Sequence, residues 1–313
     1  MAPIVQNNPS PIDFEGEIAI LKNDLNAVVI SHYYQDSEVQ DVSDFVGDSL
    51  ENIQYVSESN ADLIVFCGSR SVAESISILN PKKKVLVPDI EAEFPIDNAI
   101  SIKELVKFRD TNTSHEIVSH INSSSEVKSI SDIIVTTSNA EKIILSISKE
   151  KQILFASDKN LGSYLINKTG VPMVLIESSC LVHNNFSVRD LIGLKAAHPR
   201  AKIIAHPSCT NSILEYANHI GGSASLIKYV EERTTEEFII LTEPGIIHQM
   251  HKRAPKAKFF DVPLVNSENS IFSNESQSMR LNTLEKLYLT MKNQKPLIHI
   301  DPIVVQKARI PLE

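Results

Sequence analysis

Short apolar runs recur along the chain, and each is followed by small polar residues and then by a helical pattern. The first part of the chain holds such runs within 26–35, 62–69 and 83–89. Continuous apolar runs of four or five residues are typical of strands that are buried on both faces of a parallel sheet. Strands that alternate with helices indicate βαβ units. The pattern therefore predicts an α/β fold with short parallel sheets.

The same pattern occurs in two further parts of the chain. The apolar runs that we interpret as strands there lie within 115–124, 132–142, 151–160, 201–210, 223–229, 236–245 and 258–262. We therefore expect three similar three-layer α/β/α domains, which comprise residues 1–98, 99–184 and 185–278.

The C-terminal part of the chain follows a different pattern. Residues 279–294 have the periodicity of a helix with Asn282 near its N-cap, and we expect the helical segment 279–313 to pack back on the first domain. The polar stretch 266–278 predicts a loop, and its sequence leaves open whether it acts as a lid.

Composition narrows the class of function. Apolar residues make up 42% of the chain and charged residues 22%, as in ordinary globular proteins. The net charge of −9 argues against a nucleic-acid partner, because phosphate backbones require a basic surface. No apolar run reaches the roughly 20 residues that span a membrane, and the first residues do not have the pattern of a signal peptide. We expect a cytoplasmic protein that takes small anionic substrates and no nucleic acid or membrane partner.

Histidines mark the predicted strand ends where a ligand would bind. His32, His120 and His206 each follow the first predicted strand of a domain. In parallel α/β sheets, ligands bind beyond the carboxyl ends of the strands. One such histidine is most often structural, but three at equivalent positions favour a shared site. Small hydroxyl residues at the neighbouring helix starts serve as N-caps, and helix N-termini also bind anions.

Segments along most of the chain resemble the quinolinate synthase family. They include SHYYQDSEVQDVSDFVGDSL (31–50), ADLIVFCGSRSVAESISILNP (61–81), INSSSEVKSISDIIVTTSNA (121–140), CLVHNNFS (180–187) and AHPSC (205–209). The resemblance implies three α/β domains around a pseudo-threefold axis, with the active site at the centre, which agrees with the three units of the pattern. It also implies the condensation of an amino-acid-derived imine or enamine with a small phosphorylated carbonyl compound such as dihydroxyacetone phosphate, in N-heterocycle biosynthesis.

The resemblance also implies roles for ten residues. The catalytic residues that we expect, acting by acid–base chemistry, are His32, Tyr34, His120 and His206. The substrate-binding residues that we expect are Asp48, Ser49, Asn122, Thr137, Ser208 and Ser223. Two of the ten depart from the family, because His120 replaces a catalytic tyrosine and Ser208 replaces a catalytic glutamate.

A larger departure concerns the cofactor of the family. Its [4Fe–4S] cluster is held by three cysteines, whose positions correspond to Phe94, Cys180 and Ser276 in this chain. Only Cys180 keeps the thiol, and phenylalanine cannot ligate iron. The remaining cysteines, Cys67 and Cys209, lie in other segments. We therefore predict an enzyme without the cluster and without another cofactor.

Two alternatives stay open. A single zinc or iron ion could bind to His32, His120 and His206, because three histidines and one open position form a catalytic metal site. A non-catalytic metabolite-binding protein could also keep the pocket after losing turnover.

Overall fold

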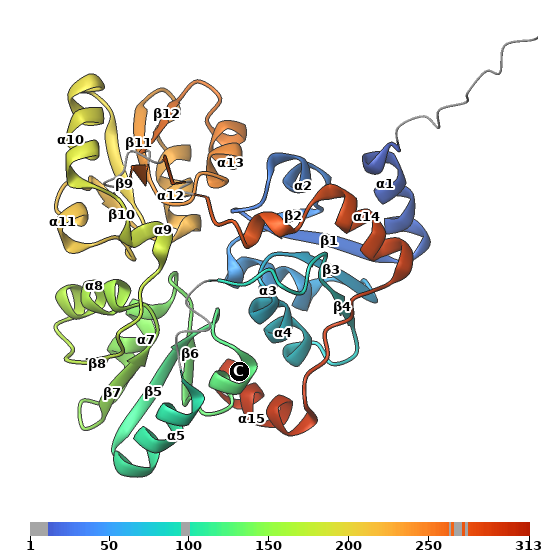
Figure 1. The fold of residues 1–313 in the computed structure, drawn as a ribbon, viewed down its shortest axis with the longest axis horizontal. Helices are drawn as coiled ribbons and strands as arrows, with labels where there is room; N and C mark the ends of the chain where they lie inside the picture. Colours follow the sequence, from blue (N-terminus) through green and yellow to red (C-terminus); the bar gives the residue numbers. More distant parts are fainter. Residues whose placement is uncertain (1–11, 95–100, 263, 266–270, 273–274) are drawn as a thin grey trace, which may run out of the picture.

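The computed structural model describes residues 12–94, 101–262, 264–265, 271–272 and 275–313. In this part of the chain, three four-stranded sheets have all their strands parallel and are surrounded by helices (Figure 1). Their strand orders are β2-β1-β3-β4, β6-β5-β7-β8 and β10-β9-β11-β12. The predicted α/β class with three similar units is confirmed.

The first unit contains the strands β1 (Ala27–His32), β2 (Phe45–Gly47), β3 (Leu63–Cys67) and β4 (Lys84–Leu86). Its helices are α1 (Phe14–Asp24), α2 (Ser37–Val42), α3 (Ser49–Glu58) and α4 (Arg70–Leu79).

The second unit contains the strands β5 (His115–His120), β6 (Ile133–Val135), β7 (Gln152–Ala156) and β8 (Val174–Leu175). Its helices are α5 (Ile102–Thr111), α6 (Ser125–Lys128), α7 (Ala140–Ser146) and α8 (Lys159–Thr169), and the short α9 (Leu181–Asn184) leads to the third unit.

The third unit contains the strands β9 (Lys202–Ala205), β10 (His219–Ile220), β11 (Glu237–Leu241) and β12 (Lys258–Asp261). Its helices are α10 (Val188–Ala197), α11 (Asn211–Leu214), α12 (Ser223–Glu231) and α13 (Ile246–Arg253). The antiparallel pair β13 (Leu264–Val265) and β14 (Ile271–Phe272), a 3-10 turn (Met279–Leu281), α14 (Leu284–Asn293) and α15 (Pro302–Leu312) follow.

Alternation along the strands gives the first unit its three layers. In β3, Ile64 and Phe66 pack into one apolar cluster, whereas Leu63 and Val65 pack into another. Successive side chains of a strand point to opposite faces of a sheet, so helices must cover both faces of this one. Because both faces of the sheet are covered, consecutive strand residues are apolar, which explains the continuous apolar runs in the sequence.

Strand pairing shows that equivalent residues of the three units lie at the carboxyl end of the corresponding strand. His32, the last residue of β1, pairs with Gly47 of β2, and His120, the last residue of β5, pairs with Val135 of β6. In the third unit, Ala205 ends β9 and pairs with Leu241 of β11, so His206 follows directly. The three histidines therefore stand at the same strand ends, as the sequence predicted.

Two predicted elements differ in the structure. Residues 223–229 form the start of α12 rather than a strand, because Leu226, Ile227 and Val230 are buried at helical spacing. The predicted helix over 279–294 is divided into the 3-10 turn and α14, and the N-cap of α14 is Thr283 rather than Asn282. Asn282 is buried instead, where its Nδ2 donates to the carbonyl oxygen of Gly68 at 3.1 Å.

The C-terminal helices join separate parts of the fold. α14 packs on α1, whereas α15 packs across α4 and α6 and so connects the first unit to the second (Figure 1). The domain boundaries stay a prediction. Of the loop predicted over 266–278, residues 266–270 and 273–274 lie outside the described part of the chain.

None of the helices in the described ranges has both the length and the apolar character that crossing a membrane requires.

Candidate active site

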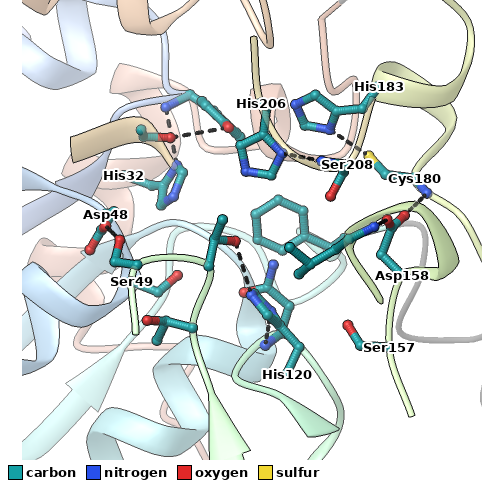
Figure 2. A pocket seen from close by; sticks show the side chains of 18 of the residues that line it. His32, Asp48, Ser49, His120, Ser157, Asp158, Cys180, His183, His206 and Ser208 are labelled. Carbon is teal, nitrogen blue, oxygen red and sulfur yellow. Dashed lines mark hydrogen bonds between the residues drawn. The ribbon is translucent and has the colours of Figure 1, made fainter. Parts of the chain in front are cut away.

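The carboxyl ends of the three sheets enclose a central cavity of about 80 Å³ (Figure 2). All ten predicted site residues line it, and they come from all three units. These residues are His32, Tyr34, Asp48, Ser49, His120, Asn122, Thr137, His206, Ser208 and Ser223. The structure thus brings the predicted set together, while the role of each residue stays a prediction.

The three histidines sit in the same local turn. Nδ1 of His32 accepts a hydrogen bond from the backbone N–H of Tyr34 at 3.2 Å. Nδ1 of His120 accepts from the N–H of Asn122 at 3.3 Å, and Nδ1 of His206 accepts from the N–H of Ser208 at 3.2 Å. In each turn, the carbonyl oxygen of the histidine also accepts from the N–H three residues later. All three turns therefore orient the imidazole ring in the same way, with Nδ1 facing a backbone N–H group.

These hydrogen bonds decide where the imidazole protons lie. A ring nitrogen that accepts a hydrogen bond carries no hydrogen, so a neutral ring holds its proton on Nε2. Burial lowers the pKa of His32 and of His120 to about 4, and burial lowers the pKa of His206 well below its usual range. At neutral pH, all three rings are therefore neutral Nε2–H donors.

The same geometry argues against a metal on these three histidines. A histidine that ligates a metal donates a hydrogen bond from its other ring nitrogen. In His32, His120 and His206 that other nitrogen would be Nδ1, which accepts instead. Within the described residues, no group of three or more His, Cys, Asp and Glu side chains is arranged to hold a metal ion.

Helix starts supply further polar groups to the cavity. Asp48 caps α3, because its Oδ1 accepts from the N–H of Glu51 at 3.0 Å. α12 begins at Ser223 after Gly222, and Gly222 offers no side-chain cap. The N–H groups in the first turn of such a helix favour an anionic ligand.

A hydrogen-bonded chain connects Tyr34 to the third unit. The Tyr34 hydroxyl lies 3.1 Å from Oγ1 of Thr242 and accepts a hydrogen bond from Oγ of Ser223 at 3.1 Å. Burial raises the pKa of Tyr34, so its hydroxyl keeps its proton at neutral pH. The chain continues to His183, whose Nε2 lies 3.0 Å from the same threonine oxygen.

Sequence reasoning missed His183 and Asp158, which also line the cavity (Figure 2). The ring of His183 stacks on that of His206 with centroids 4.2 Å apart, and its Nδ1 lies 3.2 Å from Sγ of Cys180. Asp158 accepts from the backbone N–H groups of Leu161 and Cys180, and burial raises its pKa. The available signal for Asp158 was its position two residues after the apolar run of β7, and for His183 its place in the CLVH segment that resembles the family.

Internal symmetry identifies the positions that correspond to Cys180. The N–H of Lys159 at the start of α8 donates to the carbonyl oxygen of Ser178 at 2.7 Å. The N–H of Arg70 at the start of α4 donates in the same way to Ala92 at 2.7 Å. Phe94 lies two residues after Ala92, just as Cys180 lies two residues after Ser178.

A contact between a carboxylate and the backbone at the Cys180 position also occurs in the third unit. The backbone N–H of Cys180 donates to the carboxylate of Asp158 at 2.7 Å, and Asp158 lies two residues after β7. Glu243 lies two residues after β11, and its carboxylate is hydrogen-bonded to the backbone of Ser276. Phe94, Cys180 and Ser276 therefore occupy equivalent places in the three units.

These three residues do not fit a [4Fe–4S] cluster. Phe94 turns its ring toward the cavity, 6.0 Å from that of His32 between centroids, and offers no ligand atom. Ser276 is buried and has a hydroxyl without a hydrogen-bond partner among the described residues. Cys67 and Cys209 are fully buried in apolar clusters of their own units. A cluster of this type requires thiolate ligands, and the cavity presents one thiol.

Three similar α/β units around a central cavity, with histidines at the strand ends, define an α/β enzyme whose site lies at the carboxyl ends of its strands. The family described as Quinolinate synthetase A protein matches residues 16–313. The chain is 46% identical to a quinolinate synthase of Nostoc sp. (strain PCC 7120 / SAG 25.82 / UTEX 2576), over 97% of this chain and 93% of that protein.

Two further relatives give the same result. The chain is 47% identical to the quinolinate synthase of Nostoc punctiforme, over 92% of this chain and 88% of that protein. It is 46% identical to that of Trichodesmium erythraeum, over 94% and 90%. The chain therefore belongs to the quinolinate synthase family, a family of condensing enzymes.

Proposed function

We propose that the protein is a cluster-independent condensing enzyme of this family. It joins an amino-acid-derived imine or enamine to a small phosphorylated carbonyl compound such as dihydroxyacetone phosphate, in the biosynthesis of an N-heterocycle. One observation carries the proposal: all ten predicted polar residues line the cavity, while the three equivalent ligand positions hold a phenylalanine, a cysteine and a serine.

The cavity offers suitable groups for binding such substrates. The Nε2–H groups of His32 and His206 are neutral donors that suit a carboxylate. The start of α12 at Ser223, with backbone N–H groups that no side chain caps, suits the phosphate. The volume of about 80 Å³ favours small substrates over a nucleotide.

The carbon–carbon bond can form with a balanced transfer of one proton. The enamine carbon attacks the carbonyl carbon, the carbonyl oxygen gains a proton, and the enamine nitrogen loses one as it becomes an imine. We assign this proton to the Tyr34 hydroxyl, and its contacts with Ser223 and Thr242 support the assignment because they hold the hydroxyl in one orientation. Asp158 also lines the cavity, where its carboxylate accepts from the backbone N–H groups of Leu161 and Cys180.

The test begins with the metal content of the full-length protein. Anaerobic purification followed by iron and acid-labile sulfide analysis should find neither in stoichiometric amount. About four irons per chain with matching sulfide would contradict cluster independence.

The second step is an assay with freshly generated iminoaspartate and dihydroxyacetone phosphate, followed by mass spectrometry. We expect a condensed product, which is quinolinate or an adduct that has not completed dehydration. The Tyr34→Phe variant is the matched control and should form the product at least tenfold more slowly. Binding of both substrates without any product would instead support the metabolite-binding alternative.

A further inference from the structure

His120 and Thr137 meet at the edge of the central cavity. His120 ends β5, and Thr137 lies two residues after Val135, the β6 residue with which His120 pairs. Nε2 of His120 and Oγ1 of Thr137 are 3.3 Å apart. Both side chains line the cavity. The neighbouring strands of the second unit therefore bring this pair to the substrate.

The direction of this hydrogen bond follows from the turn after β5. The N–H of Asn122 donates to Nδ1 of His120 at 3.3 Å, so the hydrogen of the neutral ring is on Nε2. Nε2 must then donate to Oγ1 of Thr137. A hydroxyl that accepts in this way still has its own hydrogen, which it can donate to a third group.

A second histidine–threonine pair lies beside the cavity, where His183 lines the cavity and Thr242 is buried behind it. Nε2 of His183 lies 3.0 Å from Oγ1 of Thr242, and this threonine contacts the hydroxyl of Tyr34. There, the threonine connects a buried histidine to a polar group that faces the cavity. In the His120–Thr137 pair, the threonine hydroxyl has no second hydrogen-bond partner among the described residues, and its side chain lines the cavity.

We propose that His120 is a positioning residue, which orients the Thr137 hydroxyl so that it donates a hydrogen bond to an anionic oxygen of the substrate. The assignment rests on the proposed function for the substrate class, an anion with carboxylate or phosphate oxygens. It gives the histidine at the family's tyrosine position a role in recognition rather than in proton transfer.

The proton position can be tested without any substrate. In ¹⁵N-labelled protein at pH 7, long-range ¹H–¹⁵N spectra separate a protonated ring nitrogen from an unprotonated one. The His120 signals, identified by their loss in His120→Asn, should show an unprotonated Nδ1 and a protonated Nε2. A proton on Nδ1 would overturn the proposal.

Binding measurements test the action of His120 through Thr137. The probes are inorganic phosphate and succinate, titrated into the full-length protein by calorimetry. Thr137→Val and His120→Asn should each weaken the binding of at least one probe about tenfold, the effect of one hydrogen bond to a charged group. Thr137→Ser and His120→Gln keep a donor in place and should bind within about threefold of the wild type.

The double variant His120→Asn/Thr137→Val distinguishes positioning from independent contacts. If His120 acts through Thr137, the double variant binds no more weakly than Thr137→Val alone. Additive losses would overturn the proposal, as would unchanged binding in Thr137→Val or no binding of either probe to the wild type. Thr111→Val in α5 is the matched control, because the Thr111 hydroxyl donates to the carbonyl oxygen of Lys107 outside the cavity, and this variant should bind like the wild type.

The two probes separate the sources of the anionic oxygen. A loss confined to phosphate assigns Thr137 to the phosphorylated substrate, and a loss confined to succinate assigns it to the carboxylate substrate. Neither measurement requires turnover. A protein that binds in the expected pattern but forms no product therefore contradicts the proposed function and leaves this inference standing.

Discussion

Ser138 of the second unit donates a hydrogen bond from Oγ to Oδ2 of Asp48 in the first unit, at 2.6 Å. The other carboxylate oxygen of Asp48 accepts from the N–H of Glu51 and caps α3. One side chain therefore fixes the start of a helix and connects two units at the edge of the cavity.

Substitutions at this contact should separate its two effects. Asp48→Ala removes the cap and the contact between units, so it should lower the free energy of unfolding by about 2 kcal/mol. Ser138→Ala removes only the contact and should cost about 1 kcal/mol. Urea unfolding measures both changes. Ser57→Ala in the exposed part of α3 is the control, and an equal loss in the two test variants would contradict this division.

Stability should rise as the pH increases from 4 to 6.5. Burial lowers the pKa of His32 and of His120 from 6.5 to about 4. Between these values, the unfolded chain binds protons that the folded protein does not, so acid favours unfolding. Each such proton corresponds to about 1.4 kcal/mol per pH unit. Unfolding in urea across this range should show the slope, and His120→Asn should reduce it by about one proton.

Between about pH 4.5 and 8, Glu243 should have the opposite effect, and it should dominate once the histidines are neutral in both states above about pH 6.5. Burial raises its pKa from 4.5 to about 8, against the opposing influence of Arg280 and the N–H of Gly245. The folded protein then keeps a proton that the unfolded chain releases, so stability is lost as the pH rises toward 8. We expect a stability maximum at about pH 7. Glu243→Gln should reduce the loss of stability above this maximum. An unchanged loss of stability would show that other groups cause it.

Removing Arg280 should destabilise the protein because Glu243 is buried. Nη2 of Arg280 lies 3.0 Å from Oε1 of Glu243, and the same guanidinium also pairs with Asp36 of the first unit. Arg280→Met leaves the carboxylate without its positive partner and should cost about 3 kcal/mol at pH 8.5. The loss should shrink at pH 6, where Glu243 is protonated. Denaturant unfolding at both pH values is the measurement, and an equal loss at both would contradict the role of charge.

Restoring cysteines at the equivalent positions should create a cluster site. The variant Phe94→Cys/Ser276→Cys presents three thiols with Cys180, one from each unit. After anaerobic reconstitution with iron and sulfide, it should hold about four irons per chain and absorb near 400 nm. The single variants are the controls and should hold less than half as much. Equal loading of the wild type would show that this chain uses other ligands.

The strand ends could be located from the sequence, but the state of their histidines could not. Apolar runs fix where buried strands end, so His32 and His206 were placed correctly at the cavity. The proton positions depend on the turns that follow the strands and on burial from all three units, which no local pattern contains. Residues 223–229 were assigned to a strand because a short apolar run suits either element until its packing is known.

Helix α15 is synthesised after the first and second units, and it packs on both of them. It packs across α4 of the first unit and α6 of the second, so the interface between these units is complete only when α15 is in place. A ribosome adds about 5–20 residues per second, and roughly 170 residues separate β6 from α15, so the two units wait on the order of ten seconds for this helix. During translation, a nascent chain therefore carries the residues of both sheets before the helix that joins the two units has been made.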